Sequence, residues 1–389
     1  MCPMPNLKQQ TPKEDLTLPS GLYIHFPFCR SKCPYCDFYS IASSSLIARW
    51  LESLKREIVF YRGEPFTSFD TVYLGGGTPS ILEVSIIGEI LDCVKGNYKI
   101  LEGAEITIEV NPGDMKPEKV AGIKSLGINR INLGVQSFND GELLFLGRRH
   151  RAEDSVMALD ELGKAGFINI GIDLIYGLKG QSLEGWVKTL ERAVSFEPKH
   201  ISCYQLTIEG KTVFNAMKSK GELEELSEDI ASIFFLKTSE YLESQGYIHY
   251  EVSNYSKDTG FRSRHNSKYW QRIPYLGLGP SAHSFDGEKR WWNYRSVKKY
   301  YESLENNMAP VDDYEILSEE QAILEKISLA LRTIYGIGRG DLDGIPGAWE
   351  NIQKLVTSGH IEILNNRIIP TKKGLLVADQ LPLYIIHDS

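Results

Sequence analysis

The stretch Gly21–Tyr39, GLYIHFPFCRSKCPYCDFY, decides how the rest of this chain is interpreted. It carries Cys29, Cys33 and Cys36 in a C-x3-C-x2-C spacing, with no fourth cysteine nearby. Three thiolates on one tight loop can hold three irons of a 4Fe–4S cluster and leave the fourth iron open. An open iron can bind a substrate or cofactor, so the spacing indicates chemistry. A structural zinc site with His25 as the fourth ligand is the alternative that the spacing alone leaves open.

The residues that flank the cysteines predict how the loop is held. Leu22–Phe26 is a short apolar run and predicts a strand that leads into the loop. Phe38 and Tyr39 follow the last cysteine directly, and we expect their rings to cover the site against solvent.

Length and composition fit a globular protein of two or three domains. The chain has 389 residues, of which 42% are hydrophobic and 11% aromatic. Its net charge of −8 argues against a general nucleic-acid binder. No apolar run reaches the roughly 18 residues of a membrane helix, and Met1–Ser20 is predicted to be a polar tail without a signal-peptide core. Scattered thiols suit a reducing cytosol better than a disulfide framework, so we expect a cytoplasmic protein; they are Cys2, Cys93 and Cys203.

Predicted strands and helices alternate between residues 21 and 210. After the first strand, five more runs predict strands: Thr71–Leu74, Glu105–Val110, Arg130–Gly134, Phe167–Ile175 and His200–Leu206. Helical periodicity lies between them, at Ser45–Phe60, Lys116–Leu126, Ala152–Ala165 and Ser182–Phe196. Alternation of this kind requires parallel strands with right-handed crossovers. The sequence therefore predicts an α/β fold, an open partial (β/α) barrel.

Polar residues and glycines fall at the carboxyl ends of these strands, where parallel barrels place their active sites. The run Gly75–Thr78 ends the second strand and lets the backbone approach a ligand closely. Glu109, Gln136 and Asp173 lie near the ends of later strands, and Arg148 follows in a loop. Taken singly, each is as readily a surface or capping residue. Together, at successive strand ends, they indicate a binding site.

These motifs resemble those of the radical S-adenosylmethionine (SAM) superfamily, whose members carry the three-cysteine loop and a GGGTP segment, here Gly75–Pro79. The surrounding residues resemble one branch, the oxygen-independent coproporphyrinogen III oxidases and their relatives, the HemW-type heme chaperones. In that superfamily the open iron chelates SAM, and one electron from the cluster cleaves it. The resemblance implies a 4Fe–4S cluster on Cys29, Cys33 and Cys36, SAM as cofactor, and a partial-barrel fold.

The same resemblance implies which residues contact SAM: Tyr23, Tyr35, Gly76, Gly77, Thr78, Glu109, Gln136, Arg148 and Asp173. The GGGTP segment is expected to receive the amino group of SAM. A guanidinium fork matches a carboxylate, so Arg148 suits the SAM carboxylate. A buried carboxylate needs a partner, and the ribose hydroxyls suit Glu109. Tyr35 is expected to stack on adenine, and His25 and Arg149 to support the site from outside.

The second half begins with a long amphipathic helix, Glu222–Gln245. We expect its buried face to carry Ile230, Ile233, Phe234 and Tyr241. A strand with alternating aromatic residues is predicted after it, at 246–255.

The segment His265–Trp270, HNSKYW, resembles the HNxxYW motif of the HemW-type branch, where the motif is linked to heme. A histidine among aromatic rings can be an axial heme ligand, whereas a lone histidine is ordinarily a bonded core or surface residue. We expect His265 to contact heme, with His283 as a weaker candidate and His249 weaker still.

The end of the chain predicts helix, helix and hairpin, a winged-helix-like arrangement. A capping box at Ser318–Gln321 opens the first helix, and the second is expected near Ala348–Thr357. Ile361–Ile369 predicts a hairpin turned at Asn365-Asn366. Because Lys354 is the one basic residue of the second helix, an interaction or lid module is favoured over DNA binding.

We therefore predict four parts: a tail at 1–20, a radical SAM partial-barrel core at 21–210, a continuation with the HNxxYW region at 211–313, and a winged-helix-like α+β domain at 314–389. Coproporphyrinogen oxidases of this type carry a fourth cysteine two positions after the third, where this chain has Phe38. They also carry a longer N-terminal extension than this sequence has before Tyr23. Both departures favour the chaperone branch.

The predicted function is a radical SAM-type heme chaperone that binds a 4Fe–4S cluster, SAM and heme and transfers heme to an acceptor protein. The expected partners are an electron donor and a heme acceptor that can be membrane-associated, and no nucleic acid. The alternative is an oxygen-independent coproporphyrinogen III oxidase that decarboxylates coproporphyrinogen III to protoporphyrinogen IX, so whether the chain is an enzyme is left open. A third hypothesis, that the chain is a DNA-binding regulator, is supported by the predicted wing alone.

Overall fold

The computed structural model describes residues 18–386 except residues 44 and 64. Residues 1–17 of the predicted tail at 1–20 lie outside the described residues. Ser20, the last residue of that tail, begins the first strand. Six parallel strands lie side by side in chain order: β1 (Ser20–Phe26), β2 (Phe69–Gly76), β3 (Ile100–Val110), β4 (Arg130–Gln136), β5 (Asn169–Tyr176) and β6 (His200–Gln205). This arrangement confirms the predicted run of six β/α units.

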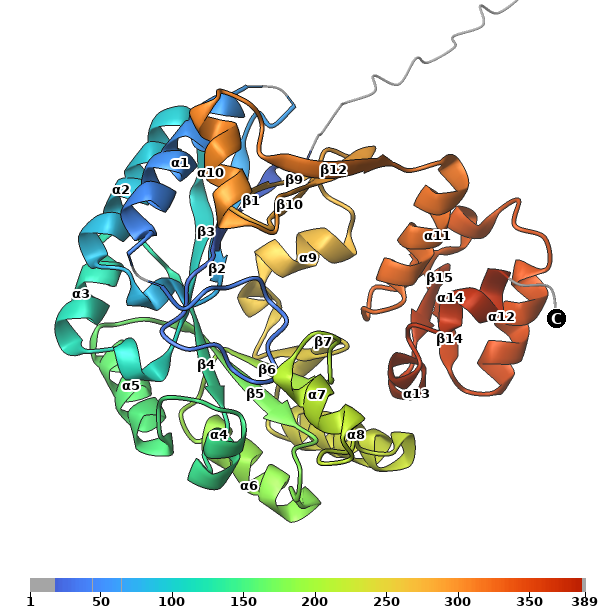
Figure 1. Cartoon of the computed structure of the whole chain (residues 1–389). Coiled ribbons are helices and arrows are strands. Elements are labelled where there is room, and N and C mark those ends of the chain that lie inside the picture. The colour runs from blue at the N-terminus through green and yellow to red at the C-terminus, as the bar shows by residue number, and fades with distance from the viewer. Residues whose placement is uncertain (1–17, 44, 64, 387–389) are drawn as a thin grey trace, which may run out of the picture.

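Helices connect these strands and cover the convex side of the sheet (Figure 1). They are α1 (Ile47–Phe60), α2 (Val84–Asn97), α3 (Pro117–Ser125), α4 (Asp140–Phe145), α5 (Ala152–Lys164) and α6 (Leu183–Val194). Short 3-10 turns lie at Pro79–Ile81, Pro112–Asp114, Thr259–Phe261 and Arg339–Leu342. Because every helix in this half crosses on one side, the other side of the sheet is left for the lumen.

The second half extends the same sheet at both edges, which leaves the barrel open. Beyond β6 lie β8 (Asn254–Ser256) and β7 (Ile248–Glu251), both antiparallel to their neighbours. Beyond β1 lie β9 (Tyr275–Leu278), β10 (His283–Phe285), β11 (Lys289–Asn293) and β12 (Val311–Ile316). The intervening helices are α7 (Val213–Ser219), α8 (Glu228–Ser244), α9 (Arg264–Trp270) and α10 (Val297–Glu305). Since β12 pairs with β11, the main sheet crosses the expected boundary at 313 and runs to Ile316.

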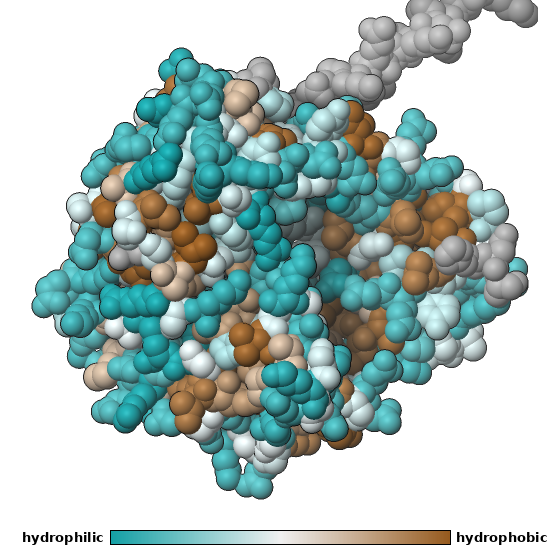
Figure 2. Space-filling view, in the orientation of Figure 1, coloured by the Kyte–Doolittle hydropathy of each residue, from teal (hydrophilic) through white to brown (hydrophobic). Residues whose placement is uncertain are grey.

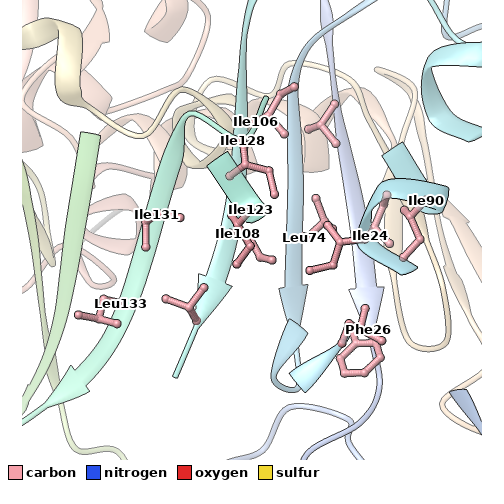
Figure 3. Close-up of a cluster of buried hydrophobic side chains, with 14 of the residues drawn as sticks. Ile24, Phe26, Leu74, Ile90, Ile106, Ile108, Ile123, Ile128, Ile131 and Leu133 are labelled. Carbon is pink, nitrogen blue, oxygen red and sulfur yellow. The ribbon is translucent and has the colours of Figure 1, made fainter. Parts of the chain in front are cut away.

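Apolar residues on the convex side of the parallel strands form the main core (Figure 3). The register places Ile24 beside Leu74, Leu74 beside Ile108 and Ile108 beside Ile131, so one row of branched side chains crosses four strands. Ile90 of α2 and Ile123 of α3 pack against this row and are fully buried. The row sits on one strand face because alternate residues of a strand point to opposite sides. Polar side chains are consequently directed into the lumen.

Two expectations for the second half are wrong in detail. Ile230 and Ile233 of α8 are 45% and 52% exposed. Phe234 is buried as predicted, Tyr241 is partly buried, and the helix also buries Phe235 and Leu242. The predicted single strand at 246–255 is a hairpin of β7 and β8. Several registers of a helix with many apolar residues can satisfy the same periodicity, and packing against α6 selects one.

Residues 319–386, here called the C-terminal module, form a body of their own beside the barrel (Figure 1). Helices α11 (Glu319–Ala330), α12 (Ala348–Thr357), α13 (Lys372–Leu376) and α14 (Leu381–Ile386) surround a small sheet of β13 (Ile337–Gly338), β15 (Arg367–Pro370) and β14 (Ile361–Leu364). The capping box at Ser318 is present. Asn365 and Asn366 turn the hairpin with φ of 48° and 62°. Its assignment as a winged helix stays a prediction.

Within the described residues, no helix is long and apolar enough to cross a membrane.

Glu57 of α1 is a buried carboxylate that holds the barrel to its extension. One of its oxygens accepts hydrogen bonds from Gly279 N–H (2.7 Å) and Tyr300 O–H (2.6 Å), and the other accepts from the Asn293 amide (2.6 Å). Burial raises the pKa of Glu57 to about 7, although the three hydrogen bonds act to lower this pKa. One side chain thus connects α1 to the loop after β9, to β11 and to α10.

Replacing Glu57 with alanine should therefore destabilise the whole first sheet edge. Three buried donors lose their acceptor, and we expect the free energy of unfolding to fall by about 3 kcal/mol or more. Urea unfolding measures the change. Glu52→Ala removes an exposed carboxylate of the same helix and should change stability by less than about 0.5 kcal/mol. Equal effects of the two substitutions would contradict the role given to Glu57.

Candidate cofactor site

The cysteine loop lies at the carboxyl end of β1 and is joined to the GGGTP segment by backbone hydrogen bonds. Gly77 N–H donates to Phe26 O (2.7 Å), and Thr78 N–H donates to Phe28 O (2.9 Å). On its other side the loop is closed by Cys29 N–H donating to Ile41 O (3.1 Å). The two motifs that sequence places 40 residues apart are therefore one structural unit.

Close approach of two backbones explains the glycine at position 77. A Cβ atom there would lie 2.4 Å from Phe28 O and 2.8 Å from Phe26 O, distances that no side chain tolerates. Gly76 N–H donates to Glu109 Oε2 (3.1 Å). Because the N–H groups of Gly76, Gly77 and Thr78 are all occupied, this segment can meet a ligand's ammonium group through carbonyl oxygens.

The three cysteine side chains are half-buried and free. Thr78 Oγ1 donates to Cys29 Sγ (3.4 Å), and Arg148 Nη1 donates to Cys33 Sγ (3.7 Å). Burial raises the pKa of Cys36 to about 11, so its thiolate form needs positive charge such as that of a bound metal. Hydrogen bonds to sulfur and a nearby guanidinium are the features that stabilise cluster thiolates. The donor set fits the predicted 4Fe–4S cluster.

His25 is a structural brace in this loop. Its Nε2 hydrogen-bonds Tyr39 O (2.8 Å) and its Nδ1 hydrogen-bonds Tyr23 O–H (3.0 Å). Burial lowers the pKa of His25 to about 4, so the ring is neutral. A zinc ion on His25 would have to break one of these hydrogen bonds. Across the described ranges no three Cys, His, Asp or Glu side chains converge on one metal ion, whereas in a cluster each thiolate binds a different iron.

A ring of polar side chains lines the lumen below the loop, one from each of the strands β1 to β5. Tyr73 O–H donates to Glu109 Oε1 (2.8 Å), and Asn132 Nδ2 donates to Asp173 Oδ2 (2.6 Å). Tyr23 lies opposite Tyr73 on the next strand, with ring centroids 6.1 Å apart. The register pairs Tyr23 with Tyr73 and Glu109 with Asn132. Glu109 lies two residues beyond the partner of Tyr73, and Asp173 two residues beyond the partner of Asn132, so all of them point to the same face of the sheet.

The two carboxylates of this ring are destabilised as anions. Burial raises the pKa of Glu109 to about 7, and the negative charge of Asp173 adds to the effect. Burial raises the pKa of Asp173 to about 6. Asp173 Oδ1 is buried and has no hydrogen-bond partner among the described residues. Such an orphaned acceptor fits a site that is completed by a polar ligand.

Arg148 lies between the ring and the cysteines. Besides Cys33 it contacts Tyr35 O–H (3.5 Å) and donates to Gly134 O (2.9 Å). A Cβ on Gly134 would meet Gln136 Nε2 at 3.0 Å and Arg148 Nη2 at 3.2 Å, so this glycine lets both side chains enter the site. Gln136 is buried with φ of 67°, a backbone conformation that non-glycine residues seldom adopt outside constrained sites.

The structure thus brings the predicted SAM contacts together. Arg148 connects Tyr35 to Cys33, and Gln136 lies beside Arg148 at Gly134. The other predicted contacts lie around the lumen: Tyr23, Gly76, Gly77, Thr78, Glu109 and Asp173. Their contact with SAM itself stays a prediction. Arg149 donates to Asp114 at the outer side of the site, and Asp114 also accepts from Ser80 O–H (2.7 Å).

His265 lies beneath this ring. It is 1% exposed, its Nδ1 hydrogen-bonds Thr71 Oγ1 (2.9 Å), and its Nε2 hydrogen-bonds Tyr269 O–H (2.9 Å). Its ring stacks on Tyr73 with centroids 5.0 Å apart. Burial lowers its pKa to about 3. Iron ligation by His265 would require one of these hydrogen bonds to break, and its assignment to heme stays a prediction.

Sequence reasoning missed two members of the ring, Tyr73 and Asn132. Each is a polar residue flanked by two apolar ones, in Val72-Tyr73-Leu74 and Ile131-Asn132-Leu133. Strand alternation marks such residues as lumen-facing, and that signal would have found both. The expected aromatic cover is wrong for Phe38, which is 68% exposed, because Lys32 and Arg295 hold the backbone around it and turn the ring outward.

Comparison with known proteins identifies relatives of this chain. The profile of the Radical SAM superfamily matches residues 23–193. Proteins named heme chaperone HemW match most of the chain. The one from Synechocystis sp. is 37% identical over 340 residues, covering 84% of this chain and 81% of the relative. Those from Mycobacterium tuberculosis and Bacillus subtilis are each 32% identical and cover 93% and 92% of this chain, and 93% and 97% of their own lengths.

Among solved structures, coproporphyrinogen III oxidase (HemN) from Escherichia coli, a radical SAM enzyme, superposes with a TM-score of 0.82. The match covers 95% of this chain and 90% of that chain at 22% sequence identity. At this identity the similarity shows the fold alone. It confirms the α/β architecture of an open, radical SAM-type partial barrel.

The close contact at Gly77 generates a prediction. Gly77→Ala should force the cysteine loop away from the GGGTP segment and lower the free energy of unfolding by about 1–3 kcal/mol. Gly96→Ala is the matched control, because a Cβ there meets nothing within 4 Å and the residue lies in α2, where alanine should stabilise by up to about 1 kcal/mol. Urea unfolding of both variants measures the difference. A Gly77→Ala protein as stable as wild type would refute the contact.

Proposed function

We propose a function for this chain from its family, because the chain belongs to the HemW family of radical SAM proteins. It binds a 4Fe–4S cluster, SAM and heme, and it delivers heme to an acceptor protein. The observation that carries the proposal is the extent of the similarity to HemW proteins. That similarity reaches 93% of the chain and so includes the HNxxYW helix and the C-terminal module, which lie beyond the Radical SAM match.

The cluster is held by Cys29, Cys33 and Cys36, and when bound it supplies a one-electron donor with one open iron. The chain's own residues tune that site. Thr78 and Arg148 direct hydrogen-bond donors at two of the sulfurs, which stabilises the thiolates.

SAM lies in the lumen above the polar ring. Carbonyl oxygens of the GGGTP segment receive its amino group, and Arg148 pairs with its carboxylate. Glu109 and Asp173 accept from its ribose hydroxyls, with Gln136 beside them. Tyr35 lies against adenine, and Tyr23 supports Tyr73 and Glu109 from the neighbouring strand.

The partners are an electron donor for the cluster and a heme acceptor, which can be membrane-associated, and the chain works in the cytoplasm. A nucleic-acid partner is not part of the proposal, since the net charge is −8.

A heme titration read by the Soret band tests the proposal, using full-length, cluster-loaded protein. We expect saturable binding of hemin near one per chain, followed by transfer of the heme to an apo-protein added as acceptor. Cys33→Ala, which removes a cluster ligand, should lose the cluster's visible absorbance, and Cys93→Ala should keep it. The same hemin titration is made with His265→Ala, and its Soret band is compared with that of wild type.

The competing activity is measured in the same preparation. Coproporphyrinogen III is supplied with SAM and a reductant under anaerobic conditions, and protoporphyrinogen is assayed. We expect no product at an enzyme-like turnover, because Phe38 stands where the oxidases carry a fourth cysteine. Product formation without saturable heme binding would replace the chaperone with the oxidase.

The raised pKa of Glu109 predicts how SAM affinity depends on pH. Glu109 is protonated below its pKa of about 7, and the carboxylate is the better acceptor for hydroxyls and the better neighbour for a sulfonium cation. SAM binding should therefore tighten as pH rises from about 6 to about 8, by up to tenfold per unit below the pKa. Asp173, whose pKa is raised to about 6, should add to the change in SAM affinity at the lower pH values.

Calorimetric titration of SAM at several pH values measures this dependence. Glu109→Gln should bind more weakly at the alkaline end and lose the part of the pH dependence that Glu109 supplies. Glu89→Gln, an exposed carboxylate of α2, should follow wild type. A Glu109→Gln profile identical to wild type would remove Glu109 from the SAM site.

A further inference from the structure

A histidine can ligate heme iron only if the porphyrin can reach a free nitrogen of its ring. Seven of the eight histidines lie in the described part of the chain. Five of them are buried, with at least one ring nitrogen hydrogen-bonded: His25, His150, His200, His249 and His265. His360 is half-buried and bonded to Ser358 Oγ (2.8 Å). His283 is the remaining one, and it is exposed with no hydrogen-bond partner among the described residues.

His283 opens β10 and stands on a defined wall. Its ring stacks on Trp292 of β11, with centroids 5.8 Å apart and an interplanar angle of 30°. The antiparallel register pairs His283 with Trp292 and Phe285 with Arg290, so all four side chains share one face of the sheet. The neighbouring Trp291 points to the other face and is buried in the main core. The imidazole is thus held by packing while its nitrogens stay free.

Cations flank this histidine. Arg295, whose side chain is 52% exposed, pairs with Asp37 of the cysteine loop (3.1 Å). Arg290 pairs with Glu325 through Nη2 and with Glu315 through Nε (3.8 Å), and this Nε makes no hydrogen bond within the described residues. Partial desolvation of the ring lowers the pKa of His283, and the charges of Arg290 and Arg295 lower it further. A neutral imidazole keeps the lone pair that iron requires, and guanidinium groups suit propionate carboxylates.

An aromatic wall continues from this position toward the HNxxYW helix. Phe285 lies 6.2 Å from Tyr275, and Tyr275 lies 4.7 Å from Tyr269 between ring centroids. Tyr269 is in turn the hydrogen-bond partner of His265. Figure 2 shows a recess with apolar residues between the barrel and the C-terminal module. Arg272 of the α9–β9 loop and Arg290 both reach Glu325 of α11 across this region.

We propose that His283 is the axial ligand of the heme that this chain carries, with Trp292 orienting the imidazole and Arg290 and Arg295 receiving the propionates. This proposal rests on the proposed heme-chaperone function. It gives the HNxxYW segment a positioning role, since His265 and Tyr269 support the aromatic wall from within the barrel. It also places the heme beside the cysteine loop, because Arg295, whose charge acts on His283, contacts Asp37.

Hemin titration of full-length His283→Ala and His283→Gln tests the proposal, with circular dichroism to confirm that each variant is folded. The dissociation constant should rise about tenfold or more, and the Soret band of the complex should shift. Added imidazole should restore the wild-type band in His283→Ala, because free imidazole can occupy the vacated coordination position. His360→Ala, which changes another accessible histidine, should keep the wild-type affinity and spectrum. His265→Ala, which removes a support of the aromatic wall, should weaken hemin binding but keep the position of the wild-type Soret band.

The outcomes separate the proposal from the function on which it rests. If wild type binds hemin saturably and His283→Ala keeps its affinity and spectrum, the ligand assignment is overturned while heme binding stands. The assignment is also overturned if His265→Ala loses the wild-type Soret band while His283→Ala keeps it. The axial ligand would then be His265 of α9. If wild type itself shows no saturable binding, the proposed function fails first.

Discussion

Two backbone hydrogen bonds, Gly77 N–H to Phe26 O and Thr78 N–H to Phe28 O, are the constraint on which the site depends. They join the cysteine loop to the end of the neighbouring strand, and they can form only because residue 77 lacks a Cβ. The thiols, Thr78 and the lumen are brought together by this junction. Without it, the cysteine loop would lose its connection to the neighbouring strand, and the thiols would not be aligned with the polar ring.

The lumen is built in two layers with different roles. The upper layer is the ring that includes Tyr73, Glu109 and Asp173, whose carboxylates have raised pKa values and whose acceptors are incompletely satisfied. The lower layer is closed by α9, where Glu105 accepts hydrogen bonds from the backbone N–H groups of Arg264 and His265. A satisfied lower layer stabilises the fold, and an unsatisfied upper layer is available to a ligand.

Much of the fold could be predicted from particular residues. The apolar runs around Val72 and Ile108 alternate with polar residues at the strand spacing, and the helices between them require parallel pairing. The cysteine spacing and the GGGTP segment located the site. The buried face of α8 was predicted wrongly at Ile230 and Ile233, because the apolar residues of the helix permit more than one buried side and only its contacts with the barrel choose between them. Phe38 was misplaced for a similar reason, since nothing local states that its ring points outward.

The sequence by itself determined the superfamily and the alternation of parallel strands with helices, and it predicted the cluster ligands, because these depend on residue types at short, fixed spacings. Tertiary structure decided the states of the histidines. His265 and His283 are both histidines among aromatic residues, and the sequence favoured the first. Folding buries His265 between Thr71 and Tyr269 and leaves His283 exposed on Trp292. Whether a ring nitrogen is free depends on partners nearly 200 residues away in the chain, such as Thr71 for His265, and those partners are brought near only by the register of the sheet.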